Sequence, residues 1–389
     1  MDNFKLREIK NTNLKTELKA VGFDKSYLLK AVDKFTYKNI KIFDLSLPQA
    51  NILKQTAISV GADCGIHREV LTSKVEKTDC LLGGSFSQLK KISAKLRSQP
   101  FKLAQLADLI ENNLEFKLKP MTIKEKIFDF KKPYIVGIVN LTNNSFSDGG
   151  EFFELDKAKK HVIALVEDGA DVIELGAEST KPFSSAVADD DQLEKLLPIL
   201  EFIKKQGIKT PISVDTRSSA VAKKCIEAGA VIINDVSGLD WDNEMAKTLA
   251  ELDVPIIIQH SKGTPETMQI NPIYENLMDE IFLELKNKIE SAIQAGIRQE
   301  NIIIDAGIGF GKTDEHNFEI IRRIEELYSL NCPVMLGVSR KCLLGISNEP
   351  NGIKDVFTLA LNAIIIEKKV NFIRVHNVKL HRKLIDLLN

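Results

Sequence analysis

The chain has 389 residues, of which 44% are hydrophobic and 28% charged, a composition typical of a soluble globular protein with a sizeable core. Its 53 lysines and arginines nearly balance 54 aspartates and glutamates, so the formal net charge is −1. Without a global basic field we expect no nucleic-acid partner and no binding to an anionic membrane, and any anion site must be local. The length favours one large domain with a smaller one.

Three features of the sequence bear on location. The first residues, MDNFKLREIKN, lack the continuous apolar segment of a secretory signal. The most apolar runs, Val254–Ile258 and Ala363–Ile366, are too short to span a bilayer. The cysteines are odd in number and have no C-x-x-C spacing, which is typical of free thiols in a reducing compartment. They are Cys64, Cys80, Cys225, Cys332 and Cys342. We therefore expect a cytoplasmic protein without a membrane segment.

Residues 1–118 mix basic helical stretches with apolar strand-like ones and predict a small α/β domain of unknown role. These stretches are Leu14–Phe23, Ile40–Leu47, Cys80–Gly84 and Phe86–Phe101. The lysine-rich segment Lys117–Lys132 is either a linker or a short hairpin that closes the bottom of the domain that follows.

From Tyr134 onward, short apolar runs alternate with amphipathic helical stretches. Continuous apolar runs suit parallel strands that are covered on both faces. Eight such units predict a closed (β/α)₈ barrel, a TIM barrel, over residues 121–389, because an open doubly wound sheet usually has about five or six strands. The expected strands are Tyr134–Asn140, Asp171–Ala177, Pro211–Thr216, Val231–Val236, Pro255–His260, Ile302–Gly307, Pro333–Ser339 and Phe372–His376.

Three polar residues emerge from otherwise apolar strands near their carboxyl ends, where the reactive groups of such barrels lie: Asp215, Asn234 and Asp305. A carboxylate accepts two parallel N–H bonds from the edge of an aminopyrimidinone ring, while an amide both donates and accepts. Together they predict a site for a flat heterocycle. The alternative for each residue alone is a cap on the next helix.

The last strand carries Arg374 and His376, which are two residues apart and therefore point to the same side. An arginine fork beside an imidazole predicts an anion clamp. The alternative is an arginine paired with a neighbouring acid and a packed histidine. Across the barrel, Asn140 offers an oxygen ligand for Mg²⁺, which takes few protein ligands when phosphate oxygens supply the rest.

Two glycine-rich segments follow strands. The stretch Asp305–Lys312 contains G-x-G-x-G without the spacing of a phosphate-binding loop. Its glycines allow the backbone to approach a flat ligand, and Phe310 provides a lid or wall. The segment Leu141–Gly150 predicts a mobile lid in which Phe146 and Asp148 cover the site.

The chain resembles the dihydropteroate synthase family, the folate-pathway enzymes targeted by sulfonamides. The resemblance covers the whole barrel, about two-thirds of the chain, through GIVNLTNNSFSDGG, ESTKP, SVDT, IINDVSG, QHSKGTPETMQ, DAGIGFGK, GVSRK and IRVHNV. It implies that 6-hydroxymethyl-7,8-dihydropterin diphosphate is joined to p-aminobenzoate with release of diphosphate. It also implies Mg²⁺ as cofactor, sulfonamides as inhibitors and a homodimer formed through the last barrel helices.

The resemblance assigns roles to individual residues. The implied pterin contacts are Asp215, Asn234, Asp305, Phe310 and Lys341. The implied diphosphate contacts are Asn140, Thr180, Arg374 and His376, with Asn140 also holding the metal. The implied p-aminobenzoate contacts are Phe146, Thr180, Lys181, Pro182, Ser339 and Lys341. The implied catalytic residues are Asp148, Lys341, Arg374 and His376.

The sequence departs from the family pattern in two loops. Asn143 and Asn144 stand where the family usually has Pro and Asp, and Lys181 and Phe183 stand where it has Arg and Gly. Lysine lacks the bidentate fork and stacking surface of arginine, so these departures bear on sulfonamide affinity and on the lid.

Two other functions remain alternatives. A corrinoid methyltransferase acting on methyltetrahydrofolate also grips a pterin edge, but it has no need of the Arg-x-His clamp and depends on cobalamin. A non-catalytic pterin-binding paralogue is the other alternative, and release of diphosphate from the two substrates distinguishes it from an enzyme.

Overall fold

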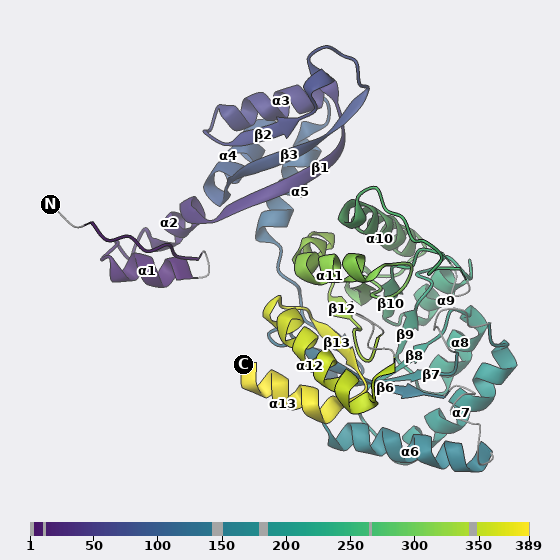
Figure 1. Ribbon diagram of the computed structural model, residues 1–389. Helices are drawn as coiled ribbons and strands as arrows, with labels where there is room; N and C mark the ends of the chain where they lie inside the picture. The colour runs from purple at the N-terminus through teal and green to yellow at the C-terminus, as the bar shows by residue number, and fades with distance from the viewer. Residues whose placement is uncertain are drawn as a thin grey trace. The chain divides into compact units, whose positions relative to one another are not determined.

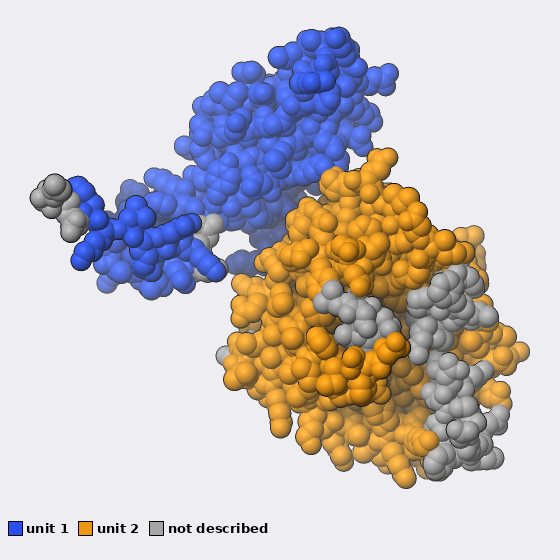
Figure 2. All heavy atoms as spheres, in the orientation of Figure 1, with its two compact units in different colours: residues 1–117 blue, residues 118–389 orange. Residues whose placement is uncertain are grey.

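The computed structural model describes residues 4–10, 13–141, 151–178, 186–263, 267–341 and 348–388. The chain divides into two compact units, Met1–Lys117 and Leu118–Asn389, which are coloured separately in Figure 2. Within the described residues, no helix is both long and apolar enough to cross a membrane.

The first unit contains a three-stranded antiparallel sheet in the order β1-β3-β2 (Figure 1). Its strands are β1 (Tyr37–Ser46), β2 (Asp63–Ile66) and β3 (Lys77–Ser85), and its helices are α1 (Leu14–Ala20), α2 (Leu28–Phe35), α3 (Leu47–Ile58), α4 (Phe86–Leu96) and α5 (Leu103–Glu115). Leu53, Leu82 and Ile92, from α3, β3 and α4, are fully buried in one core. Helix α4 starts where Ser85 caps it by accepting a hydrogen bond from the Gln88 backbone N–H at 3.3 Å. The expected small α/β unit is therefore present.

The second unit is a closed barrel of eight parallel strands in chain order, each followed by a helix (Figure 1). The strands are β6 (Tyr134–Asn140), β7 (Val172–Gly176), β8 (Ile212–Asp215), β9 (Ile232–Asp235), β10 (Ile256–Gln259), β11 (Ile302–Asp305), β12 (Val334–Leu336) and β13 (Phe372–Val375). The helices are α6 (Glu151–Glu167), α7 (Asp189–Lys205), α8 (Ser219–Glu227), α9 (Met245–Leu252), α10 (Leu277–Gln294), α11 (Asp314–Arg323), α12 (Asn351–Glu367) and α13 (Val378–Leu388). Every predicted strand contains the observed one, so the predicted (β/α)₈ barrel is confirmed.

The barrel interior consists of an apolar layer below a polar one. The apolar layer is one buried cluster, formed by Val136, Val172, Ile232, Ile257, Ile303, Met335 and Phe372. Residues two positions further along each strand point to the same side. Five of these are polar: Glu174, Asn234, Gln259, Asp305 and Arg374. Along the inward-facing side of most strands, an apolar residue is therefore followed by a polar one nearer the carboxyl end, where the mouth of the barrel lies.

Strands β4 (Met121–Ile123) and β5 (Lys126–Phe128) form an antiparallel hairpin. Its buried side chains, Met121, Ile123 and Phe128, pack into the apolar cluster. The fully buried Phe128 ring lies 4.7 Å from the Tyr134 ring and 5.5 Å from the Phe372 ring, measured between centroids. Of the two alternatives for Lys117–Lys132, the structure shows the hairpin at the bottom of the barrel. The carboxyl ends of the strands form the opposite, polar end.

Candidate active site

A buried ionic network lies across the polar mouth of the barrel. Glu174, in the middle of β7, is 1% exposed, and its carboxylate accepts a hydrogen bond from Arg374 Nε. Arg374 Nη2 donates to Asp215 Oδ2 at 3.1 Å. Asn234 Nδ2 and Ser213 Oγ donate to Glu174 Oε2 at 3.0 and 3.4 Å. The network joins strands β7, β8, β9 and β13 and compensates a carboxylate that is expensive to bury alone.

Sequence reasoning missed Glu174. It predicted the polar residues near the strand ends, but Glu174 precedes the last two residues of its strand. A signal was available, because Glu174 is the single acid in the run VIELG. Ionised residues are almost never fully buried without a partner, so an acid inside a continuous apolar strand indicates a paired or functional group.

Two acceptors in the mouth are suited to a ligand with N–H donors. Asn234 Oδ1 is buried without a hydrogen-bond partner among the described residues, whereas buried polar atoms normally have one. Burial, and then the negative charge of Glu174, raise the pKa of Asp215 well above its usual range. A ring edge with N–H groups would satisfy the amide oxygen and favour the ionised carboxylate.

Asp305 stands at the end of β11, close to the ammonium of Lys341. Its Oδ1 accepts a hydrogen bond from Gly307 N at 2.7 Å, and burial raises its pKa despite the opposing charge of Lys341. Lys341 Nζ donates to the carbonyl of Ile308 and lies 4.6 Å from the centroid of the Phe310 ring. Burial lowers the pKa of Lys341 to about 8. Phe310, which is 9% exposed, therefore packs beside the Lys341 ammonium.

His376, just after β13, and Ser339, three residues after β12, form a second polar pair. The distance between Ser339 Oγ and His376 Nδ1 is 2.9 Å, and His376 N donates to Ser339 Oγ at 3.1 Å. Burial, together with the positive charges of Arg340 and Arg374, lowers the pKa of His376 to about 3. His376 is therefore a neutral imidazole. The guanidinium of Arg374 is engaged by Glu174 and Asp215, so it is oriented by acids rather than free.

The remaining predicted site residues lie at the edges of the described structure. Asn140 ends β6, is exposed, and pairs in register with Gly176. The predicted positions in the two loops after β6 and β7 lie outside the described residues. These are Phe146, Asp148, Thr180, Lys181 and Pro182.

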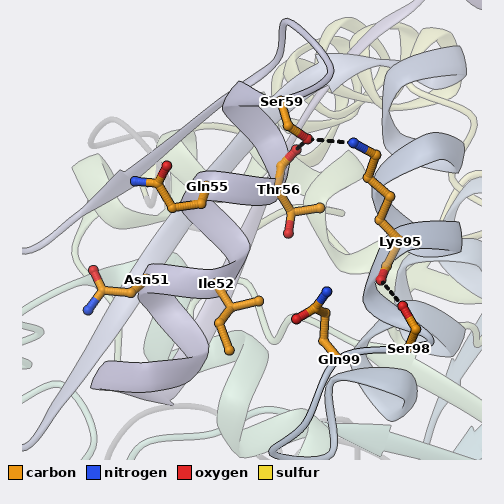
Figure 3. A pocket seen from close by; sticks show the side chains of 8 residues that line it. All are labelled: Asn51, Ile52, Gln55, Thr56, Ser59, Lys95, Ser98 and Gln99. Atoms are coloured by element: carbon orange, nitrogen blue, oxygen red, sulfur yellow. Dashed lines mark hydrogen bonds between the residues drawn. The ribbon is translucent and has the colours of Figure 1, made fainter.

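A surface depression on the first unit has a different character (Figure 3). It lies between α3 and α4, where Lys95 Nζ donates to Ser59 Oγ at 2.8 Å and Ser98 Oγ donates to the Lys95 carbonyl at 3.1 Å. Lys95 is the charged residue of its lining, and the others are neutral: Asn51, Ile52, Gln55, Thr56, Ser59, Ser98 and Gln99. The buried acids and bases lie instead in the barrel mouth, which is the candidate active site.

The profile of the pterin binding enzyme family matches residues 136–376, so the chain belongs to this family. The barrel with buried acceptors at its mouth is thus that of a pterin-binding enzyme. Among its relatives is the dihydropteroate synthase of Clostridium beijerinckii, 41% identical over 66% of this chain and 94% of the relative. The structure of Yersinia pestis dihydropteroate synthase with a sulfonamide drug complex has a TM-score of 0.65 at 32% identity, covering 69% of this chain and 98% of that one. Within the pterin-binding enzymes, the chain is thus a member of the dihydropteroate synthases.

A further relative extends into the first unit. A probable bifunctional folylpolyglutamate synthase/dihydropteroate synthase of Haloferax volcanii is 33% identical over 85% of this chain. That is more than residues 118–389 alone provide, so part of the first unit also matches. The chain spans 40% of that relative's length.

Proposed function

We propose that the barrel mouth joins 6-hydroxymethyl-7,8-dihydropterin diphosphate to p-aminobenzoate, giving 7,8-dihydropteroate and diphosphate in folate biosynthesis. The observation that carries this proposal is the buried layer of Glu174, Asp215, Asn234 and Arg374, which combines acceptors for a ring edge with an oriented cation. Family membership supplies the reaction.

The pterin is held by Asp215, Asn234, Asp305 and Lys341, with Phe310 as the wall. The unpartnered Oδ1 of Asn234 accepts a ring N–H, and the two carboxylates accept the exocyclic and ring N–H groups. A ligand without those donors would leave buried acceptors unpaired, which is the physical basis of discrimination.

The diphosphate leaves toward Arg374, His376, Asn140 and Thr180. The bond between the methylene carbon and the diphosphate oxygen breaks, and its electron pair departs with diphosphate. Burial lowers the pKa of Arg374, but the carboxylates of Glu174 and Asp215 together outweigh burial and raise this pKa, so the guanidinium remains charged throughout. A preoriented cation stabilises charge that develops on the leaving oxygen without reorganising.

The p-aminobenzoate is received by Ser339, Lys341 and the two loop segments. The proposed loop contacts are Phe146, Thr180, Lys181 and Pro182, and Asp148 has a catalytic role in the first loop. The neutral aniline nitrogen attacks the methylene carbon and then releases its proton to solvent, so a strong base is not required. A relative's complex with a sulfonamide drug supports the proposal that sulfonamides compete for this position.

A magnesium ion fits the donor chemistry of the mouth. Among the described residues, groups of three or more His, Cys, Asp or Glu that could hold a metal are absent, so a site built mainly from protein ligands is not formed there. Asn140 is an exposed oxygen donor, and phosphate oxygens would complete the shell. When bound, Mg²⁺ neutralises charge on the diphosphate.

The direct test is diphosphate release from the two substrates by the purified full-length chain. We expect turnover in the wild type and a loss of about 100-fold or more in Arg374→Ala. Arg298→Ala is the matched control, because Arg298 forms an exposed ion pair with Asp253. Cobalamin-dependent methyl transfer without diphosphate release would favour the methyltransferase alternative, and pterin binding without either reaction would favour a non-catalytic protein.

We also propose a homodimer formed through α12. Ile353, Val356, Phe357 and Ile364 on this helix are between 44% and 60% exposed. Their spacing of three, one and seven residues forms one stripe along the helix. Such a contiguous apolar stripe indicates a surface that another molecule covers.

The two units are proposed to be separate domains with the chemistry in the second. A chain that starts at Leu118 should keep the hairpin and the barrel, because β4 and β5 pack into the barrel's own core. We expect it to release diphosphate at the wild-type rate, and an inactive but folded fragment would contradict this.

The cysteines support a cytoplasmic location. Cys64 and Cys80, on the neighbouring strands β2 and β3, are buried free thiols. Thiols so placed persist in a reducing compartment. Fractionation of the source cells with an antibody to the chain tests this.

A further inference from the structure

The loop between β11 and α11 is held by side chains. Four consecutive backbone carbonyls, from Ile308 to Gly311, each accept a hydrogen bond from a different side chain. The donors are Lys341 Nζ to Ile308, Gln269 Nε2 to Gly309 at 2.6 Å, Lys312 Nζ to Phe310 at 2.9 Å and the Tyr274 hydroxyl to Gly311 at 2.8 Å. The loop that follows Asp305 therefore takes its shape from residues that converge on it.

Lys312 is the donor with most partners. It is 2% exposed, and its ammonium lies 2.9 Å from the Phe310 carbonyl, 2.8 Å from His260 Nδ1 and 3.4 Å from the His260 carbonyl. An ammonium has three N–H groups, so the three acceptors match its capacity. Burial is the main cause that lowers the pKa of Lys312 to about 7. A buried cation is costly to maintain, and Lys312 is not among the proposed contacts of either substrate.

The partners of Lys312 connect it to the pterin contacts. Gly307 N donates to Asp305 Oδ1 at 2.7 Å. Gly307 has φ +66°, and a Cβ there would lie 1.9 Å from the His260 carbonyl oxygen, so the two backbones are in direct contact. Lys312 binds that same carbonyl and the carbonyl of Phe310. Lys312 therefore joins the end of β10, at His260, to the loop after β11, at Phe310. This is the loop that orients the Asp305 carboxylate.

We infer that Lys312 is a positioning residue for the pterin, which holds the loop after β11 so that Asp305 and Phe310 keep their binding geometry without touching the substrate itself. This rests on the proposed function, in which Asp305 and Phe310 are pterin contacts. Lys341, which bonds the Ile308 carbonyl here, turns to the ligand in that function. The hydrogen bond from Lys312 to the Phe310 carbonyl then remains to fix the loop.

The test is Lys312→Met in the full-length chain, with Lys288→Met as the matched control. Lys288 is also a mostly buried lysine, and it donates to the carbonyls of Ser237 and Gly238 at 3.0 and 2.8 Å, in the loop after β9. For Lys312→Met we expect the KM for the pterin diphosphate, and the calorimetric Kd for a pterin, to rise about 10-fold or more. The KM for p-aminobenzoate should change less than about twofold, and Lys288→Met should leave both values near wild type.

A double-mutant cycle separates positioning from general support. If Lys312 acts through Asp305, then adding Lys312→Met to Asp305→Asn should weaken pterin binding much less than it does alone. Additive effects, or equal losses for both substrates, would overturn the inference. So would loss of the native far-UV spectrum in both Lys312→Met and Lys312→Gln, because the lysine would then support the fold.

Assays of the wild-type chain distinguish a failure of the proposed function from a failure of the positioning role of Lys312. A wild-type chain that releases no diphosphate from the two substrates contradicts the proposed function. An active wild type, with a folded Lys312→Met variant of unchanged pterin affinity, contradicts the positioning role alone.

Discussion

Arg374 and Glu174 are 200 positions apart in the chain, yet Arg374 Nε donates to the Glu174 carboxylate inside the barrel mouth. The pair joins β13 to β7, which are not neighbours in the barrel, because β6 lies between them. Asp215 Oδ2 accepts a hydrogen bond from Nη2 of the same guanidinium. The cation proposed to receive the diphosphate is thus aimed by acids on two other strands.

Glu174→Gln tests this relationship. Breaking a buried ion pair leaves Arg374 without its main partner, so the free energy of unfolding should fall by about 3 kcal/mol in chemical denaturation. With Arg374 no longer oriented, kcat/KM for the pterin diphosphate should fall about 10-fold or more. Glu300→Gln is the control, since Glu300 forms an exposed pair with Arg298 at 3.1 Å. Wild-type kinetics in Glu174→Gln would mean that the pair does not orient the guanidinium.

His376 should make stability depend on pH. Its folded pKa of about 3 is below the ordinary value of 6.5, so between these values the unfolded chain binds a proton that the folded chain does not. This contribution to stability is complete above pH 6.5 and is lost as pH falls toward 3, by about 2 kcal/mol at pH 5.

The measurement is the free energy of unfolding at pH 7.5 and at pH 5. The difference between the two pH values should shrink by about 2 kcal/mol in His376→Asn and stay unchanged in the variant of the exposed His67, His67→Asn. An undiminished difference in His376→Asn would show that His376 is protonated in the folded state.

Phe128→Ala should destabilise the barrel without changing its chemistry. The ring is fully buried between Tyr134 and Phe372 at the end opposite the mouth, and a Phe-to-Ala cavity costs about 3–5 kcal/mol. The neighbouring Ile127 is 63% exposed, so Ile127→Ala should cost about 0.5 kcal/mol or less. Denaturant melts and pterin calorimetry measure the two effects, and reduced pterin affinity in folded Phe128→Ala would contradict the separation of the two ends.

Val356→Asp should dissociate the proposed dimer, because a charge would have to be buried at the centre of the apolar stripe on α12. Light scattering should report a dimer for the wild type and a monomer for the variant. Ile270→Asp changes an equally exposed apolar residue outside α12 and should leave the dimer intact. A monomeric wild type at micromolar concentration would remove the proposal.

The sequence predicted the barrel well because its signal is local. Continuous apolar runs such as Val254–Ile258 define buried parallel strands, and their number defines closure. It also predicted the polar residues that stand at strand ends, Asp215, Asn234 and Asp305, because barrel topology brings strand ends together whatever the details of packing. The alternatives for Lys117–Lys132 stayed open, since a short hairpin forms only where a partner such as Phe372 receives it.

The sequence by itself determined the fold of residues 121–389, the family and the polar side chains near the strand ends, Asp215, Asn234 and Asp305, because strand period and apolar runs are properties of neighbouring residues. The tertiary structure alone decided which of those side chains pair. The Glu174–Arg374 pair and the three bonds of Lys312 depend on closure of the barrel and on loops packed backbone against backbone. Burial then makes each unpaired polar group costly, so contacts between distant residues, rather than local patterns, set the geometry of the site.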